Sequence, residues 1–391
     1  MSTLTVGVLR ETATRERRVA LDPASVKALT AAGRAVLVEA DAGSAASYPD
    51  DLYVAAGARI SSRDDVVASS AVIAVVRPPD TALAAGLRDG QVLIGLLDPL
   101  NHLTMVHELS DRTVTVVAFE MLPRTLSRAQ SMDALSSQSS TAGYRAAIVA
   151  AEAFGRYLPM MITASGTATP AKVMVIGTGV AGLQAIATCQ RLGAVVTGYD
   201  VRAASRGEVE SLGARFLTPS VAHGAGGGGY ARAMTAPEQH AQQAELAKML
   251  ESCDVIITTA KVPGHAPPVL VSTATLAKLR PGSVCVDLGS SESGGNVAGS
   301  VDGQRVVTTG GVIVIGGGEL ASDLPTSSSQ MYGRNVAAVI ASLFPADVLV
   351  VDPTDEVHKN IVISTGGVIT NESVAHALSP VDDRLVTAVA S

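Results

Sequence analysis

Apolar runs alternate with helix-like segments along the first third of the chain. The strand-like runs are residues 4–9, 35–39, 71–76, 91–97 and 113–119, and segments with helical spacing, such as 23–32 and 83–88, lie between them. Because these runs are apolar throughout, they are typical of a parallel sheet that helices cover on both faces. The pattern predicts a first α/β domain.

A second α/β pattern runs from about residue 171 to residue 318. Its later strands are expected at 254–259, 283–288 and 306–315, and long helical patterns flank it at 131–156 and 327–343. Two such helices suggest that the chain enters the second domain and then returns to the first. We therefore expect two doubly wound α/β domains linked by two long helices, with a ligand cleft between them. Residues 1–130 and 325–391 would form the discontinuous first domain with the C-terminal tail, and residues 131–324 the second.

Some segments depart from this alternation. Residues 160–169 are predicted to be a short extended segment between two prolines, with a turn at Gly166. The run 223–229 is rich in glycine and is predicted to be a mobile surface loop. In the tail, alternating apolar and polar residues around two glycines predict a β-hairpin over 361–369.

The length and hydropathy of the chain limit its class. At 391 residues it is too long for one ordinary core, which agrees with two domains. Its mean hydropathy is positive, yet no apolar run approaches the roughly 18 residues that a membrane span needs. The longest candidate, 336–351, is interrupted by Pro345 and Asp347, and no charged segment followed by an apolar one opens the chain. We therefore expect a soluble cytoplasmic protein without direct membrane insertion.

Charge and cysteine usage argue against several partners. The net charge of −7 and the lack of a basic run argue against nucleic acid. The three cysteines, Cys189, Cys253 and Cys285, show no C-x-x-C spacing, and the histidines show no ligand pattern. Buried free thiols are therefore favoured over a metal or redox role, and no metal site is predicted.

The most informative motif is Gly177-x-Gly179-x-x-Gly182, between an apolar strand and an alanine-rich helix. A second apolar strand then ends at Asp200. In such a motif the first glycine permits a tight turn, the second lets the backbone approach a pyrophosphate, and the third lets the helix pack closely on the sheet. The helix N-terminus faces the phosphates with unpaired N–H groups, and the acidic residue binds ribose hydroxyls. Together these features predict a Rossmann-like dinucleotide site, with the cofactor in the cleft between the domains.

The acidic residue also bears on which nucleotide binds. Asp200 would repel a 2′-phosphate, which favours NAD(H) over NADP(H). Arg202 and Arg206 lie close enough in the sequence to leave the opposite choice open. Lys261, after the strand at 254–259, would face either a phosphate or solvent.

Several blocks of the sequence resemble a known family. Residues 7–11 and 16–21 are similar to a signature shared with alanine dehydrogenases, whereas 127–137, 229–234 and 324–330 are much more specific to transhydrogenases. Nearly the whole chain therefore resembles the soluble NAD-binding components of proton-translocating NAD(P)+ transhydrogenases in which the alpha subunit is split.

The resemblance implies a nicotinamide site in the loop that precedes the first long helix. There, Arg124, Gln130, Asp133 and Ser136 would hold the nicotinamide, with Gln130 and Asp133 as the catalytic residues. The spacing from Arg124 to Gln130 is one residue longer than the family usually shows, so Arg128 is an alternative for the arginine. Polar residues that only cap a helix are the alternative to a site.

The resemblance also assigns a loop that closes over bound nucleotide, to which Tyr230 and Met234 belong. By the residues alone, a tyrosine beside a glycine run is more often only a loop anchor. The residues expected to contact NAD(H) are Arg124, Arg128, Gln130, Asp133, Ser136, Gly177, Gly179, Val180, Gly182, Asp200, Val201, Arg202, Tyr230, Met234 and Ala260.

Proton chemistry separates the two enzyme classes that share this pattern. Oxidation of an amino acid moves a proton as well as a hydride, so it needs a positioned base. Where alanine dehydrogenases carry a lysine, this chain has Arg77, which cannot act as a base near neutral pH. Where they carry a histidine, residues 96–100 contain none, and His102 is displaced. Transfer between two nicotinamide rings moves only a hydride, so the protein supplies orientation and excludes water.

The resemblance therefore implies hydride transfer between NADH and NADP+, the latter on a separate NADP(H)-binding subunit. Transfer would be coupled to proton movement through a membrane proton-channel subunit. A homodimer is also implied, with 160–169 as a candidate contact, and so is a cytoplasmic location at the inner membrane through the partner subunits. An amino-acid dehydrogenase with relocated acid–base residues and a non-catalytic NAD-binding regulatory module stay open as alternatives.

Overall fold

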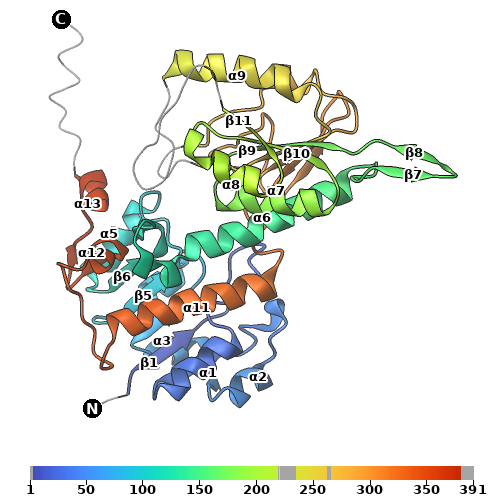
Figure 1. The fold of residues 1–391 in the computed structure, drawn as a ribbon. Helices are drawn as coiled ribbons and strands as arrows, with labels where there is room; N and C mark the ends of the chain where they lie inside the picture. Colours follow the sequence, from blue (N-terminus) through green and yellow to red (C-terminus); the bar gives the residue numbers. More distant parts are fainter. Residues whose placement is uncertain (1–2, 219, 221–234, 262–265, 380–391) are drawn as a thin grey trace, which may run out of the picture. The chain divides into compact units, whose positions relative to one another are not determined.

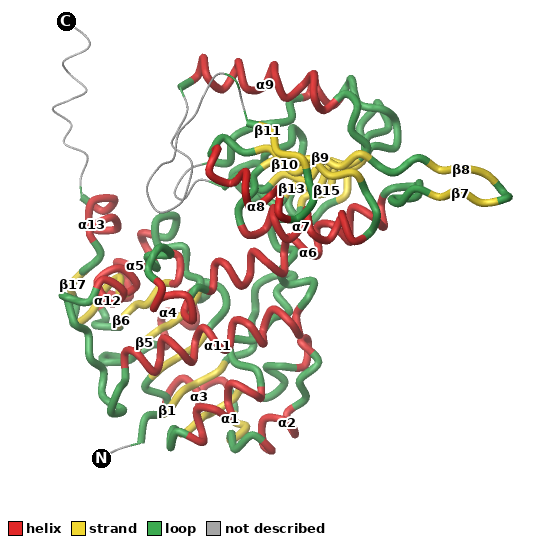
Figure 2. Tube along the Cα trace, viewed as in Figure 1, coloured by secondary structure: helices red, strands yellow, loops and turns green. Residues whose placement is uncertain are grey.

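The computed structural model describes residues 3–218, 220, 235–261 and 266–379. Its contacts divide the chain into two compact units. Unit 1 comprises Met1–Ala13, Arg18–Ala134 and Tyr332–Ser391, and unit 2 comprises Thr14–Arg17 and Leu135–Met331. Each unit is built around its own mostly parallel sheet, so the α/β class is confirmed (Figure 1 and Figure 2).

The described strands of unit 1 form an eight-stranded sheet in the order β17-β16-β6-β5-β4-β1-β2-β3. Neighbours from β6 to β3 are parallel, whereas β16 is antiparallel to both β6 and β17. The strands are β1 (Thr5–Val8), β2 (Ala35–Glu39), β3 (Arg59–Ser61), β4 (Val72–Ala74), β5 (Val92–Gly95), β6 (Thr115–Ala118), β16 (Val362–Thr365) and β17 (Val368–Ile369). The apolar runs predict all of these except β3, a short edge strand with no fully buried residue, and β17 lies in the predicted hairpin.

Helices of unit 1 begin where short polar side chains accept the free N–H groups of the first turn. Asp22 and Asp80 cap α1 and α4 in this way, at 3.1 Å and 2.8 Å. The sheet buries apolar residues on both faces, in one cluster that includes Val6 and another that includes Ile73. The described helices are α1 (Pro23–Ala31), α2 (Asp50–Ala55), α3 (Arg63–Ser69), α4 (Thr81–Gly86), α5 (Leu103–Asp111), α12 (Glu356–Ile361) and α13 (Glu372–Leu378), with 3-10 turns η1 (Ser44–Ala46), η2 (Phe119–Met121) and η3 (Ser127–Met132).

The two predicted long helices are α6 (Ala134–Ala153) and α11 (Pro325–Leu343), and both are confirmed. The second half of α11 packs into unit 1. Tyr332 is fully buried there, and its hydroxyl donates to the carbonyl of Val75 (2.8 Å). Its ring meets Phe119 edge-on, with the ring centroids 5.5 Å apart. These contacts hold this half of α11 to the unit 1 core.

The described strands of unit 2 form a seven-stranded sheet in the order β11-β10-β9-β12-β13-β15-β14, parallel except for β14 against β15. Its strands are β9 (Lys172–Ile176), β10 (Val195–Tyr199), β11 (Arg215–Leu217), β12 (Val255–Thr258), β13 (Val284–Asp287), β14 (Arg305–Val307) and β15 (Ile313–Gly316), and its other helices are α7 (Val180–Arg191), η4 (Ala203–Ser205), α8 (Arg206–Ser211), α9 (Ala236–Leu250) and α10 (Thr273–Leu276). The chain runs outward from β9 through β10 to β11 and then returns to β12 on the other side of β9. Ligands bind at such a switch point, outside the carboxyl ends of the strands.

Two expectations for unit 2 need correction. A single strand over 306–315 is wrong, because this run forms β14 and β15, which pair antiparallel. Gly311 between them has φ +76°, a backbone conformation that turns the chain back on itself. In addition, the sequence pattern does not predict β11, an edge strand in which only Phe216 is buried.

Residues 160–169 form a hairpin that projects from unit 2 (Figure 1 and Figure 2). Its strands β7 (Met161–Thr163) and β8 (Gly166–Ala168) pair antiparallel, and Gly166 has φ +140° at the predicted turn. Ile162 is 75% exposed and Met160 63% exposed. The hairpin therefore presents apolar side chains outside the core of unit 2.

The hairpin predicted in the tail is confirmed as β16 and β17. Gly366 and Gly367 join the two strands, both with positive φ, and β16 pairs with β6. The tail thereby extends the sheet of unit 1. The glycine-rich run 223–229 lies outside the described residues. Among the residues that the structure describes, no helix has both the length and the apolar character to cross a bilayer.

Candidate functional site

The glycine motif forms the turn between β9 and α7. Gly177 has φ +93° and donates its N–H to the carbonyl of Tyr199 (2.8 Å), which ties the turn to the end of β10. A side chain at Gly177 would collide with Thr259, and one at Gly182 would overlap the carbonyl of Gly177. The packing of the chain itself therefore requires glycine at both positions.

Gly179 differs from the other two glycines. It is the N-cap of α7 and supplies no side-chain cap. An added Cβ would meet only Nη2 of Arg202, at 4.0 Å, so packing does not require glycine here. A side chain would instead enter the space before the first turn of α7, where backbone N–H groups have no acceptor within the helix. This arrangement binds phosphate groups in other proteins.

Asp200 follows β10 and is buried beside the glycine turn. Its Oδ2 accepts the N–H (2.8 Å) and the hydroxyl (3.0 Å) of Thr178. Arg202 donates its N–H (2.8 Å) and Nε (3.1 Å) to Oδ1, and Nη2 (3.0 Å) to Oδ2. Burial alone would raise the pKa of Asp200, but the hydrogen bonds from Arg202 and Thr178 outweigh it and lower the pKa. The carboxylate is therefore ionised at neutral pH.

This pairing changes the expectation for Asp200, because donors of the chain itself already engage both of its oxygens. Thr178 belongs to the glycine turn and is buried with it. The Arg202 side chain is 23% exposed and comes from the loop after β10, so it is the donor that a ligand can replace. Ribose hydroxyls would reach Asp200 in exchange for that side chain. Val201, half-buried, lies between the two residues.

The end of β12 is held by a second polar network. Asn296 is fully buried and pairs with Ala260 in both directions, at 3.0 Å and 2.9 Å. Asp287, at the end of β13, accepts a threonine hydroxyl of β12 (2.9 Å), and burial raises its pKa. Lys261 is exposed. Asn296 and Asp287 are not predicted from the sequence because neither lies in a motif, and their one signal is a polar residue directly at the end of an apolar strand.

The residues implied for the nicotinamide are distributed between the two units. Gln130 lies on η3 in unit 1 and is exposed, and Asp133 directly precedes α6. Ser136 lies in the first turn of α6 and belongs to unit 2. Tyr230 and Met234 lie outside the described residues.

The two candidate arginines have different partners within unit 1. Nε of Arg124 lies 3.5 Å from Oδ2 of Asp133, and the two side chains are 27% and 13% exposed. Arg128 instead forms two hydrogen bonds of 2.7 Å to Asp355. Only Arg124 is therefore paired with another residue of the implied nicotinamide site.

Buried or half-buried carboxylates hold the loops in which a dehydrogenase base was considered. Glu11 accepts the N–H of Arg77 (3.3 Å) and that of the residue before it (2.6 Å). Glu120 accepts the N–H of Asp98 (2.9 Å) and that of the residue before it (3.2 Å). His102 is exposed at the start of α5. The carboxylates nearest these loops thus act as acceptors for the backbone.

Glu120 should make the stability of unit 1 depend on pH. Burial raises its pKa from 4.5 to about 7. Between these values the folded chain binds more protons than the unfolded chain, so stability falls as the pH rises. Relative to Glu120→Gln, the free energy of unfolding of the wild type should fall by about 3 kcal/mol between roughly pH 4.5 and 7.5, measured by urea denaturation. Identical pH dependence in the two proteins would contradict this assignment.

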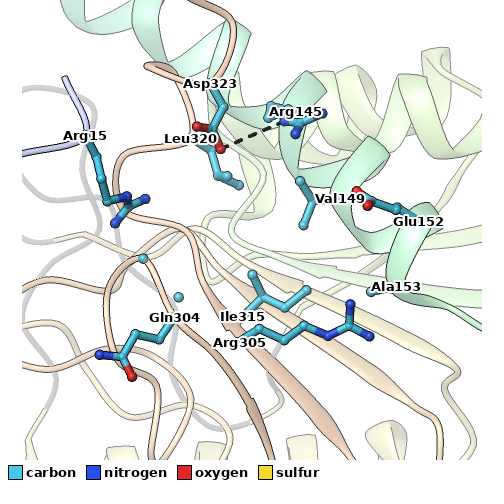
Figure 3. A pocket seen from close by; sticks show the side chains of 12 residues that line it. Arg15, Arg145, Val149, Glu152, Ala153, Gln304, Arg305, Ile315, Leu320 and Asp323 are labelled. Carbon is cyan, nitrogen blue, oxygen red and sulfur yellow. Dashed lines mark ion pairs between the residues drawn. The ribbon is translucent and has the colours of Figure 1, made fainter. Parts of the chain in front are cut away.

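A separate cavity of about 240 Å³ lies at the β14–β15 edge of the unit 2 sheet (Figure 3). Its charged lining consists of Arg15, Arg145, Arg305, Glu152 and Asp323. Nε of Arg145 and Oδ2 of Asp323 are 4.0 Å apart. None of the residues implied for the nucleotide lines this cavity, so cavity size does not locate the site.

Comparison with known proteins establishes the family. The models for the N-terminal and C-terminal domains of alanine dehydrogenase/PNT match residues 7–142 and 146–372. The first of the separate chains that make up the NAD(P) transhydrogenase alpha subunit of Rhodospirillum rubrum is 40% identical over 380 residues, which cover 94% of this chain and 98% of that protein. Alanine dehydrogenase of Mycobacterium tuberculosis is 31% identical over 299 residues, which cover 74% and 73% of the two chains.

A solved structure agrees with the sequence comparisons. The structure of transhydrogenase from Sinorhizobium meliloti is 39% identical and covers 93% of this chain and 99% of its own, with a TM-score of 0.83. The similarity thus extends over both units and includes the glycine turn described above. This chain belongs to the alanine dehydrogenase/PNT family.

Proposed function

We propose that this chain is the NAD(H)-binding component of a proton-translocating NAD(P)+ transhydrogenase. It holds NADH while hydride passes to NADP+ on a partner subunit, and a membrane proton-channel subunit couples the transfer to proton movement. The partners would keep the chain at the cytoplasmic face of the inner membrane. The observation that carries the proposal is similarity along nearly the whole chain to the first chain of a split transhydrogenase alpha subunit. The loops at Arg77 and Asp98, which lack the dehydrogenase lysine and histidine, support it.

The adenosine and pyrophosphate half of NAD(H) would bind in unit 2. Gly179 leaves room before α7, whose first N–H groups and positive end favour the pyrophosphate. Asp200 would take the ribose hydroxyls once the Arg202 side chain has moved aside. The other residues proposed for this half are Gly177, Val180, Gly182, Val201 and Ala260, with Tyr230 and Met234 on a closing loop.

The nicotinamide half would be held by Arg124, Gln130, Asp133 and Ser136. Because transfer between two rings moves a hydride and no proton, these residues need to set distance and orientation and to exclude water. Such a site requires neither a general acid nor a general base.

Asp200→Asn should weaken NADH binding and reduce selectivity against NADPH. The substitution removes charge-assisted hydrogen bonds to the ribose, which corresponds to roughly a tenfold or larger increase in Kd. It also removes the charge that repels a 2′-phosphate, so the ratio of the NADPH and NADH dissociation constants should fall. Fluorescence titration with both nucleotides measures the two effects. Glu210→Gln, at an exposed ion pair with Arg206, is the control, and an unchanged ratio in Asp200→Asn would refute its role in selectivity.

The projecting hairpin is proposed to join two copies of the chain. Its exposed Ile162 and Met160 and the marginal stability of an isolated hairpin in water both favour a covering partner. Because Ala171 donates its N–H to the carbonyl of Leu158 (2.9 Å), residues 160–169 can be replaced by a short glycine turn. Sedimentation velocity should then show monomers that still bind NADH. A shortened chain that remains dimeric would exclude the hairpin as the dimer contact.

The proposed function is tested by mixing this chain with the NADP-binding component of a related transhydrogenase. Reduction of an NAD analogue by NADPH should occur in the mixture, whereas each component alone should be inactive. Turnover of pyruvate, ammonia and NADH by the isolated chain would instead support an amino-acid dehydrogenase. Tight NADH binding without transfer in any mixture would support a regulatory module.

A further inference from the structure

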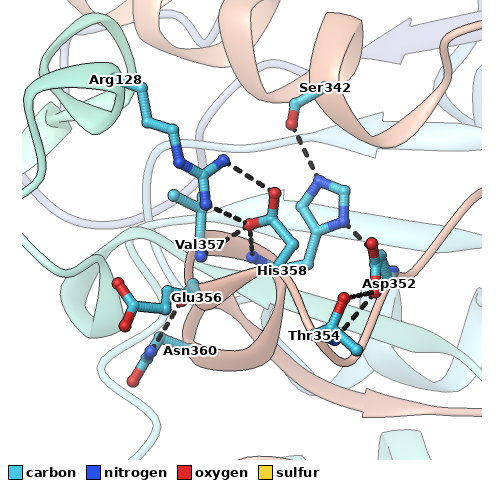
Figure 4. Close-up of polar contacts among 9 residues, drawn as sticks. Arg128, Ser342, Asp352, Thr354, Glu356, Val357, His358 and Asn360 are labelled. Atoms are coloured by element: carbon cyan, nitrogen blue, oxygen red, sulfur yellow. Dashed lines mark hydrogen bonds and ion pairs between the residues drawn. The ribbon is translucent and has the colours of Figure 1, made fainter.

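The C-terminal segment of unit 1 contacts the short helix that carries one of the implied nicotinamide residues. On η3, Nη1 and Nη2 of Arg128 each donate to a different oxygen of Asp355, both at 2.7 Å (Figure 4). In such a two-bond pairing the planes of guanidinium and carboxylate are fixed relative to each other. The contact therefore sets orientation as well as distance.

Asp355 is itself held in place. It is the N-cap of α12, and its Oδ1 accepts two N–H groups of the first turn, at 2.8 Å and 3.1 Å. The buried His358 anchors the same helix, because its Nδ1 accepts the N–H of Asp352 (3.2 Å) and its Nε2 lies 2.8 Å from Oγ of Ser342 on α11 (Figure 4). Since Nδ1 accepts, the neutral ring carries its proton on Nε2 and donates to Ser342. Arg128 thus binds a carboxylate that is tied to two helices.

The remaining anchors of η3 lie on its inner side. Ala129 is 1% exposed, and the carbonyl of Ser131 accepts Nδ2 of Asn335 on α11 (2.8 Å). The Arg128 side chain is 52% exposed and attaches the outer side of the same turn. Core packing, α11 and α12 therefore hold η3 together.

We propose that Arg128 is a positioning residue for hydride transfer. Through Asp355 it holds η3 so that Gln130, and Asp133 directly after it, present their side chains to the nicotinamide, and it does not contact the nucleotide itself. The inference rests on the proposed function and assigns the direct contact to Arg124. It also gives the C-terminal segment a role in the site.

Loss of this pair should slow transfer without emptying the binding site. In the complex reconstituted with the NADP-binding component, Arg128→Ala should lower the transfer rate roughly ten- to a hundredfold. The Kd for NADH of the variant chain should change less than about threefold. Asp355→Asn keeps the helix cap and should have the same effect, and the double variant should show no further loss. Arg128→Lys, which replaces the planar fork by a point charge, should give an intermediate rate.

Lys359→Ala is the matched control, because Lys359 forms an exposed ion pair from the same helix to Glu372 of α13 (2.9 Å). It should change neither rate nor binding. Amide hydrogen exchange over residues 127–133 should rise equally in Arg128→Ala and Asp355→Asn and stay constant in the control.

A parallel loss of NADH affinity and rate in Arg128→Ala would overturn the inference, and so would additive losses in the double variant. If the wild-type mixture transfers no hydride, the proposed function fails. The exchange measurement then still decides whether the pair holds η3, since unchanged exchange in both variants would refute that contact's role.

Discussion

Asp133→Asn is expected to slow hydride transfer about a hundredfold in the reconstituted complex, while the Kd for NADH changes less than about fivefold. Asparagine keeps the size of the side chain but removes the charge that lies 3.5 Å from Arg124. Transfer depends steeply on the placement of the nicotinamide, whereas most of the affinity is proposed to come from the adenosine and pyrophosphate half. Single-turnover kinetics and NADH fluorescence titration measure the two quantities separately.

Gln130→Ala should show the same separation between rate and affinity. The matched control is Asp111→Asn on α5, where the carboxylate is 68% exposed and pairs with His107. Equal losses of affinity and rate in Asp133→Asn would mean that this loop only binds the nucleotide.

Gly182→Ala and Gly179→Ala should both abolish or strongly weaken NADH binding, for different reasons. A Cβ at Gly182 overlaps the carbonyl of Gly177, so this variant should lose roughly 2 kcal/mol or more of stability. Gly179 has φ −77°, which alanine adopts readily, and its nearest neighbour would be 4.0 Å away. Gly179→Ala should therefore unfold like the wild type but bind NADH roughly a hundredfold more weakly.

Thermal unfolding without ligand and NADH titration of both variants distinguish these mechanisms. Normal NADH binding by Gly179→Ala would show that the N-terminus of α7 does not receive the pyrophosphate. A stability loss as large as that of Gly182→Ala would instead show that Gly179 serves the fold.

The regions of the molecule that the sequence predicts are those whose physical requirements lie within a short segment. The β9–α7 turn is one, because Gly177 and Gly182 have no room for a side chain. The central strands of unit 1 are another, because a strand buried on both faces is apolar throughout. Edge strands such as β3 and β11 are exposed and carry no such pattern.

Contacts between distant residues explain most of what could not be predicted from the sequence. Arg128 and Asp355 are 227 positions apart, and Asn296 meets Ala260 across 36 positions. The Asp200–Arg202 contact is local, but it depends on a side-chain conformation that residue types do not specify. In the run 306–315, apolar character alone does not distinguish one long strand from the antiparallel pair β14 and β15.

Transfer of an isotopic label tests most directly whether this chain supports hydride transfer between two nicotinamides. NADH labelled with deuterium at one or the other C4 position is mixed with NADP+, this chain and the NADP-binding component in ordinary water. A parallel reaction uses unlabelled nucleotides in deuterated water. We expect full transfer of deuterium to NADPH from one of the two labelled forms and no incorporation from the solvent. Solvent deuterium in the NADPH, or no NADPH from a mixture that binds NADH, would contradict the proposed function.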